Sequence, residues 1–178
     1  AQFFDESIYP HTKDTFAPFN DPIPKIAIIN TRLESVAGYF SPPDNLPISV
    51  YPFSNQVFNI MVDPQVGVGS SAYLGTIAHE YFHAIQWIED PTEETWVNEG
   101  LAELSAVLAG LPSIPSHFYT ENQATSLINW PDNPQQALAN YAGARLFMTY
   151  LSEITGIQNL PLLISGEHDG TEAIEQYL

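Results

Sequence analysis

The sequence predicts an α+β domain in which a small N-terminal mixed sheet packs on a predominantly helical lobe. Short apolar runs bounded by proline, asparagine and aspartate occupy residues 25–62, as is typical of strands. From residue 72 onward, apolar residues recur instead at helical spacing. The length of 178 residues suits a single domain, with a strand-rich lobe over about 1–70 and a helical lobe over about 71–178.

The first lobe begins with a proline-containing arm over residues 1–24, which we expect to be extended or loosely helical and to pack onto the domain. The apolar runs that follow predict three strands, at 25–30, 36–40 and 57–62. Residues 67–71, which contain two glycines and two serines, predict a loop between the two lobes.

The second lobe is expected to hold three long helices and a short terminal one. Leu74, Ile77, Tyr81 and Ile85 share one face and predict a largely buried helix over 72–89. The next predicted helix spans 91–110, with Asp90 as its N-cap, Pro91 in its first position and Glu93 completing a capping box. A third helix is predicted over 135–155, where Gly156 ends it, and a short helix is predicted after Asp169. Proline-rich loops are expected over 111–134.

The charge balance excludes some partners. Four basic residues stand against 21 acidic ones, a formal net charge of −17, so a nucleic-acid partner is not expected. No apolar run approaches the roughly 20 residues that span a membrane. The N-terminus lacks a basic start and an apolar stretch, so a signal peptide was either never present or has been removed. An acidic, proline-rich chain without cysteine is typical of a secreted bacterial enzyme, and its end at Leu178 also fits a module of a larger protein.

The residues that indicate chemistry begin at His79-Glu80-Tyr81-Phe82-His83. Two histidines four residues apart on a helix project from one face and can share one metal ion. Glu80 is turned beside that ion and can accept a proton from water bound to it, which is the mechanism of the H-E-x-x-H pattern. Without cysteine in the chain, further ligands must be His, Glu, Asp or water.

The second predicted helix offers the third ligand. It follows the first almost directly and should return antiparallel, which brings Glu99 back to the level of the histidines. Two His and one Glu leave a fourth position for water, as in a catalytic zinc site. Glu103, one turn further on, is expected to accept a hydrogen bond from the other nitrogen of a ligating histidine, and it is also an alternative ligand.

These residues resemble a known family. His79-Glu80-x-x-His83 followed by Trp96-Val97-Asn98-Glu99-Gly100-x-Ala102-Glu103 is similar to the gluzincin zinc metallopeptidases, in particular to the alanyl aminopeptidase and leukotriene hydrolase branch and to secreted bacterial peptidases of the hyicolysin type. The resemblance covers residues 72–104 and implies a zincin-like catalytic domain, with Glu99 as ligand and Glu103 as its outer partner. Fifteen residues separate His83 from Glu99, fewer than in the aminopeptidase or thermolysin branches, so Glu103 stays open as the ligand.

The resemblance extends more weakly to the third predicted helix. Tyr141-Ala142-Gly143 is similar to the Tyr-x-x-Gly helix of the aminopeptidase branch, although here the glycine is two residues after the tyrosine. It implies Tyr141 as the donor that stabilises the developing oxyanion, a role that suits a neutral phenol.

The expected function is therefore zinc-dependent hydrolysis of peptide bonds, with Glu80 as general base and one Zn²⁺ ion. The aminopeptidase branch holds the free amine of its substrate with an acidic residue in a Gly-x-Met-Glu-Asn stretch, and the corresponding residues 52–60 contain no acidic side chain. This favours an endopeptidase, with the strand at 57–62 as a candidate edge for an extended peptide or protein substrate. The alternatives are an aminopeptidase, a non-catalytic zinc-binding domain derived from a peptidase, and an acidic interaction domain whose histidines lie in the core.

Overall fold

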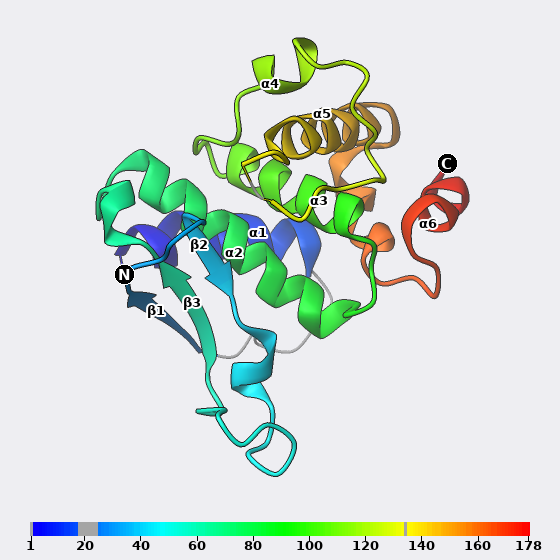
Figure 1. Ribbon diagram of the computed structural model, residues 1–178. Coiled ribbons are helices and arrows are strands. Elements are labelled where there is room, and N and C mark those ends of the chain that lie inside the picture. Colours follow the sequence, from blue (N-terminus) through cyan, green and yellow to red (C-terminus); the bar gives the residue numbers. More distant parts are fainter. Residues whose placement is uncertain (1, 18–24, 134) are drawn as a thin grey trace.

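The computed structural model describes residues 2–17, 25–133 and 135–178. It shows a mixed α/β fold in which three short strands form one small mixed sheet and most of the remaining structure is helical (Figure 1). This confirms the predicted combination of a small mixed sheet and a predominantly helical part. In the described part of the chain, no helix is both long enough and apolar enough to cross a membrane, as expected.

The N-terminal arm is helical and not extended. A π-helical turn, η1 (Phe4–Ile8), leads into α1 (Tyr9–Phe16). Pro10 lies in the first turn of α1, where the N–H that it lacks would have had no helical partner. The rings of Phe4 and Tyr9 pack on Tyr81, which fixes the arm to the first long helix. The arm prolines at 18, 22 and 24 lie outside the described residues.

The sheet consists of β1 (Ile26–Asn30), β2 (Gly38–Phe40) and β3 (Phe58–Val62) in the order β1-β3-β2. β1 and β3 are parallel, and β2 and β3 are antiparallel. The strand predicted at 36–40 is shorter in the structure, where it spans 38–40. The expectation that 57–62 is an edge strand is wrong, because β3 lies between the other two strands. β3 is the central strand because β1 and β2 both pair with it, and its Ile60 and Val62 are fully buried, whereas Tyr39 of β2 is exposed.

The helical part follows in the predicted order. Two short 3-10 turns, η2 (Pro42–Asn45) and η3 (Pro64–Val66), precede and follow β3. The regular elements of the helical part are α2 (Ser71–Glu89), α3 (Thr95–Leu108), α4 (His117–Thr120), α5 (Leu138–Thr155), η4 (Ile157–Leu163) and α6 (Gly170–Tyr177). Ser70 caps α2 by accepting a hydrogen bond from the backbone N–H of Tyr73. Gly156 ends α5 with a φ of 93°, a conformation that favours glycine. The loops predicted over 111–134 contain the single turn α4.

The predicted capping box at residues 90–93 is wrong, because α3 begins four residues later than expected, at Thr95. Asp90 instead forms a local turn, in which its Oδ1 accepts hydrogen bonds from both the backbone N–H and the hydroxyl of Thr92. Glu93 accepts from the backbone N–H of Glu94 and of Gly170, so it joins the connector to the start of α6. The third long helix also begins later, at Leu138 and not at 135.

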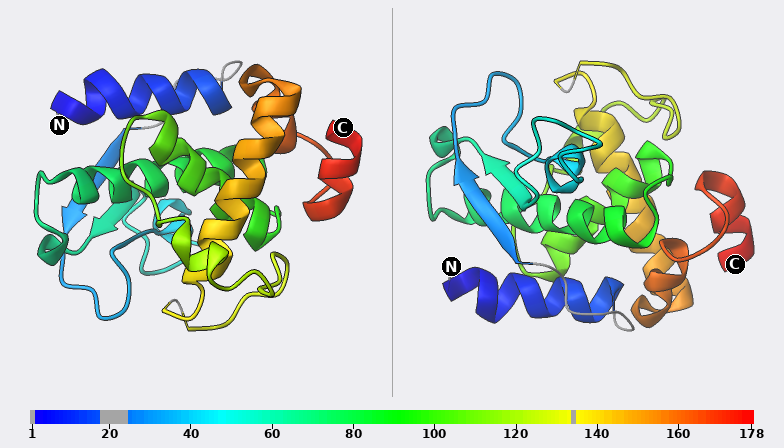
Figure 2. Two further views of the ribbon diagram at one scale, coloured as in Figure 1. Left: turned by 90° about the horizontal axis from the view of Figure 1, so that it is seen from above. Right: turned by 90° about the horizontal axis from the view of Figure 1, so that it is seen from below.

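The elements are layered around α2. One side of α2 packs on β2 and β3, α3 packs on another side, and α5 covers α3 (Figure 1). α1 runs alongside α2 (Figure 2). One continuous cluster of buried apolar residues joins these layers. Gly100 of α3 lies against the backbone of Ala144 in α5, where a Cβ would come within 3.0 Å of the Ala144 carbonyl oxygen, so glycine allows these helices to approach closely.

Candidate metal centre

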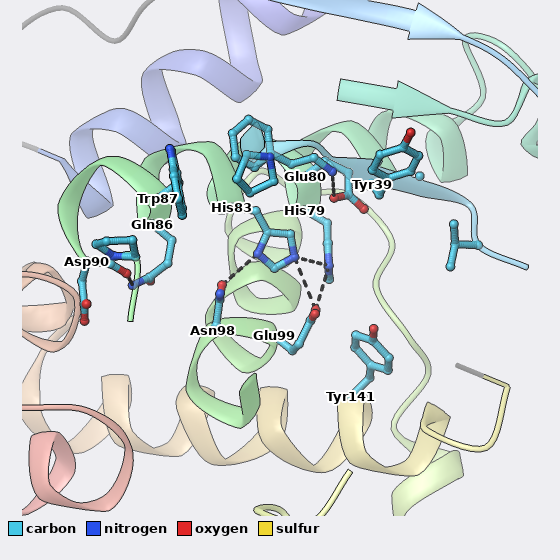
Figure 3. Close-up of a pocket in the computed structure, with 15 residues that line it drawn as sticks. Tyr39, His79, Glu80, His83, Gln86, Trp87, Asp90, Asn98, Glu99 and Tyr141 are labelled. Carbon is cyan, nitrogen blue, oxygen red and sulfur yellow. Dashed lines mark hydrogen bonds and ion pairs between the residues drawn. The ribbon is translucent and has the colours of Figure 1, made fainter. Parts of the chain in front are cut away.

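The two histidines of α2 direct one nitrogen each to a common point. Their Nε2 atoms are 3.0 Å apart, and both rings lie on the side of α2 that faces α3 (Figure 3). Residues 79 and 83 share a helix face because four residues are close to one helical turn. α2 is rigid here, since its other faces are buried against the sheet and the N-terminal helix.

Glu99 of α3 completes a triangle with these nitrogens. Its Oε2 lies 3.1 Å from the Nε2 of His79 and 3.4 Å from the Nε2 of His83. Neighbouring ligand atoms in a tetrahedral site with bonds of 2.0–2.1 Å are separated by about 3.3 Å. The three donors therefore fit one small ion, and within the described residues they form the one group of three or more His, Asp and Glu side chains close enough to share a metal.

The two helices bring these groups together by running antiparallel, as expected. The Nδ1 of His83 lies 2.8 Å from Asn98 Oδ1, whereas Ser105, near the other end of α3, donates to the carbonyl oxygen of Ala78 at 3.0 Å. The two helices therefore run in opposite directions. The five-residue connector between Glu89 and Thr95 is longer than expected, but it still returns Glu99 to the level of the histidines.

The outer nitrogen of each histidine also has an acceptor. The Nδ1 of His79 lies 3.0 Å from the Oε1 of Glu103, and the Nδ1 of His83 is paired with Asn98. Each acceptor favours a proton on Nδ1, so Nε2 is the nitrogen that each ring would offer to a metal ion at the shared point. Glu103 thus occupies the outer position that we expect for it, on the far side of the ring from Glu99. Sequence reasoning missed Asn98, although its place directly before Glu99 was a signal that an amide would lie near the rings.

Glu80 lies beside this group on the side of the sheet. Its side chain is buried, and its Oε2 accepts a hydrogen bond of 2.8 Å from the backbone N–H of Phe40 in β2. β2 approaches closely because of Gly38, where a Cβ would come within 2.6 Å of the Thr76 methyl group and 2.8 Å of the Met61 carbonyl oxygen. Strand β2 therefore orients the carboxylate that the sequence predicts as the base.

The charges of the site are strongly coupled. Burial opposes a charge on His79, but hydrogen bonds to Glu103 and Glu99 outweigh it and raise the pKa of this imidazole well above its ordinary value. Burial also opposes the charge of His83, and Glu99 again outweighs it and raises the pKa. The imidazoles in turn overcome the burial of Glu99 and lower the pKa of its carboxyl, so Glu99 stays ionised. Burial raises the pKa of Glu80.

Tyr141 reaches the site from α5. Its ring centroid is 6.2 Å from that of His79 and 4.8 Å from that of Trp130, which supports it edge-on. Figure 3 shows the side chain rising from α5 toward the histidines and Glu99. Burial raises the pKa of its hydroxyl well above the usual range, and the nearby Glu99 adds to this effect. Tyr141 is therefore a neutral hydrogen-bond donor at any physiological pH.

Two cavities flank the candidate centre and share His79, Glu80 and Tyr141 in their walls. One of about 400 Å³ follows α2 toward the α2–α3 connector, between that helix and β2. The other, of about 350 Å³, has mostly apolar walls from the start of α2, the loop after α3 and the start of α5. His79, Glu80 and Tyr141 therefore lie where the two cavities meet, whereas His83 and Glu99 line only the first cavity and Glu103 only the second. No protein-family model matches this chain, and no curated protein matches its sequence.

Proposed function

We propose that this protein is a zinc-dependent peptidase with a zincin-like catalytic domain of the gluzincin type. The observation that carries the proposal is the triangle of donor atoms from His79, His83 and Glu99, with sides of 3.0, 3.1 and 3.4 Å. Each ring in that triangle is oriented by a second hydrogen bond, as is usual for histidines that ligate a metal.

Zinc fits this set of donors better than the other common ions do. Two imidazoles and one carboxylate suit Zn²⁺, whereas Mg²⁺ and Ca²⁺ prefer oxygen alone. Three protein ligands leave a fourth position for water or substrate, which distinguishes a catalytic from a structural zinc. When bound, the ion supplies Lewis acidity that polarises a carbonyl group and lowers the pKa of water.

The protein side chains supply the rest of the reaction. Glu80 accepts the proton of the attacking water and passes it to the leaving amine, and the Phe40 N–H keeps its carboxylate in position. Tyr141 donates a hydrogen bond to the oxygen that becomes negative. An extended peptide can lie along β2, the edge strand on the side of the site, instead of along β3.

The preferred activity is that of an endopeptidase outside the cell or at its surface. An aminopeptidase must hold a free amine close to the scissile bond with an acidic side chain. The cavity that follows α2 places Glu80 and Glu99 near that position, and both already have roles in the proposed mechanism. Peptides with an acetylated N-terminus test this preference, because an endopeptidase cleaves them as well as the free forms.

The decisive experiment compares the wild type with Glu80→Gln. We expect about one zinc ion per chain in both proteins, and a loss of peptide hydrolysis of about 10²- to 10⁴-fold in Glu80→Gln. Glu121→Gln, which changes an exposed glutamate in the same way, is the matched control and should keep full activity. Zinc content is measured by elemental analysis and hydrolysis with quenched fluorescent peptides.

Each alternative predicts a different result. Bound zinc without hydrolysis of any peptide would favour a non-catalytic zinc domain. A protein that neither retains zinc nor gains thermal stability from it would show that the histidines are core residues, and the proposal would fail. Equal turnover by Glu80→Gln and the wild type would remove Glu80 from the mechanism.

A further inference from the structure

The side-chain amide of Asn98 has one end in use and one end free. Its Oδ1 accepts from the Nδ1 of His83 at 2.8 Å. Within the described residues, nothing accepts a hydrogen bond from its Nδ2, and this nitrogen is not shielded from solvent. The NH₂ group, which carries two donors, is therefore available to a ligand.

This free amide lies in the wall of the cavity that follows α2, next to the metal centre. Asn98 lines that cavity of about 400 Å³ and does not line the smaller one. Figure 3 shows the His83 ring between Asn98 and the point that this ring shares with His79 and Glu99. One imidazole ring and one hydrogen bond thus separate the amide from an ion at that point. A peptide advances by at most about 3.6 Å per residue, so a group one or two residues from a carbonyl at the ion can reach Asn98.

The β2 wall of the same cavity is short of donors. The backbone groups of Tyr39 and Ser41 pair with β3, so those of Phe40, between them, are directed to the free edge of the sheet. The N–H of Phe40 is already bound to Glu80 at 2.8 Å. Pro42, which also lines the cavity, has no N–H. A peptide along this part of β2 therefore meets a carbonyl oxygen but no backbone donor.

The other neutral donors in the lining are engaged or directed elsewhere. In the proposed mechanism, the Tyr141 hydroxyl binds the oxygen that becomes negative. The amide of Gln86 donates to a backbone carbonyl oxygen. Figure 3 shows the hydroxyl of Tyr39 and the ring nitrogen of Trp87 directed away from the histidines. A second peptide carbonyl that loses water in this cavity needs a donor, and among the described lining residues Asn98 can supply it.

We infer that the Nδ2 of Asn98 binds a backbone carbonyl oxygen of the substrate, one or two residues from the cleaved bond. The inference rests on the proposed function, because it assumes a peptide whose scissile carbonyl lies at the metal centre. It gives one side chain two tasks, since Oδ1 orients a ligating ring and Nδ2 holds the chain to be cut. A contact with the backbone selects for an extended peptide and not for a particular side chain at that position.

The experiment weakens the acceptor in the peptide. In a set of fluorescent peptides, one backbone carbonyl oxygen at a time is replaced by sulfur, which is a weak acceptor. Their affinities for the zinc-loaded Glu80→Gln protein are measured by fluorescence anisotropy. Mass spectrometry of the products formed by the wild type locates the cleaved bond. We expect sulfur at one position, within two residues of that bond, to weaken binding by about 3- to 10-fold.

The variant Asn98→Asp, made in the Glu80→Gln protein, keeps the oxygen that His83 needs and removes the donor. It should retain about one zinc ion per chain, bind the unmodified peptide about tenfold more weakly, and lose its sensitivity to sulfur at that position. Asn133→Asp is the matched control, because the Oδ1 of Asn133 also accepts a hydrogen bond, from the N–H of Gln135, outside this cavity. This control should respond to sulfur as the unaltered site does.

A second measurement leaves the site unaltered. In ¹⁵N spectra of the zinc-loaded Glu80→Gln protein, the side-chain amide signal of Asn98 is assigned by its absence from the Asn98→Asp spectrum. This signal should shift when the unmodified peptide binds, and less when the peptide carries sulfur at the sensitive position. The shift decides the matter if Asn98→Asp binds zinc poorly: a signal that moves supports the contact, and one that stays in place overturns it.

The outcomes separate this inference from the proposed function. Equal sensitivity to every sulfur position with and without Asn98→Asp would overturn the assignment even if the wild type cleaves peptides. One carbonyl whose effect depends on Asn98 would support it even if turnover is never detected. A protein that binds none of the peptides would remove both proposals.

Discussion

Substitution of Glu103 by glutamine tests how far the metal centre depends on the acceptor behind His79. In the wild type, Glu103 Oε1 lies 3.0 Å from His79 Nδ1, and Oε2 accepts a hydrogen bond of 2.6 Å from the backbone N–H of Ile114. Glutamine has a single side-chain oxygen. Whichever way it turns, its NH₂ group must face either the ring N–H or the Ile114 N–H, so one pair of donors is left in contact.

The expected loss of zinc affinity follows from that geometry. A hydrogen bond to a charged group contributes about 1.5–3 kcal/mol, which corresponds to about tenfold to a hundredfold in a dissociation constant. Loss of a partner that orients a ligating histidine has typical effects of the same size. We therefore expect the zinc Kd of Glu103→Gln to rise by about 10- to 100-fold.

The assay is competition with a fluorescent chelator at pH 7.5, together with thermal melts of the metal-free proteins. The melts are needed because Glu103 also holds the loop at Ile114. Glu153→Gln, an exposed change on α5, is the control and should bind zinc as the wild type does. An unchanged Kd in Glu103→Gln, or a weakening fully explained by a less stable metal-free fold, would refute the role of Glu103.

Gly38→Ala should cost about 1–3 kcal/mol of stability because a Cβ at this position has no room between β2 and α2. Gly166→Ala, where a Cβ would make only ordinary van der Waals contacts, should melt close to the wild type. Tyr141→Phe should lower kcat by about tenfold or more with little change in zinc Kd, and a kcat equal to that of the wild type would contradict its role as a donor. In the metal-free protein, the raised pKa values of His79 and His83 contribute to the free energy of unfolding. This contribution is fully present below about pH 6.5, the pKa of an unfolded histidine, and is lost as the pH rises through the higher pKa values of the folded state. Zinc requires the neutral rings, so its affinity should rise over the same interval, by up to about tenfold per pH unit for each displaced proton. In calorimetric titrations from about pH 6 to 9, a zinc affinity that does not rise with pH would show that the rings were already neutral.

The sequence was most informative where local periodicity determines position. The spacing of His79 and His83 places both rings on one helix face whatever surrounds them, and their approach to Glu99 required only that the next helix return antiparallel. The place of Glu103 followed from the same geometry, since it is one turn beyond Glu99 on α3.

The features that depend on distant contacts were less predictable. Nothing in residues 57–62 taken alone indicates that β1 and β2 both pair with this strand, so its central place was missed. The predicted start of α3 was wrong because the Asp90 side chain accepts a hydrogen bond from Thr92 in a local turn instead of capping a helix. The same sequence of residues is compatible with either interaction. The contact between Asn98 and His83 depends on the rotation of α3 about its axis, which sequence spacing does not determine.

All three donors of the candidate metal centre come from about twenty consecutive residues, between His79 and Glu99. The segment from His83 to Glu99 is about half as long as the one that joins β1 to β3, so closing it costs about 0.6 kcal/mol less in loop entropy. A zinc ion could thus tether the two central helices into a hairpin before the sheet is complete. We expect zinc to speed refolding as well as to slow unfolding, so that the ion acts as a template for the fold.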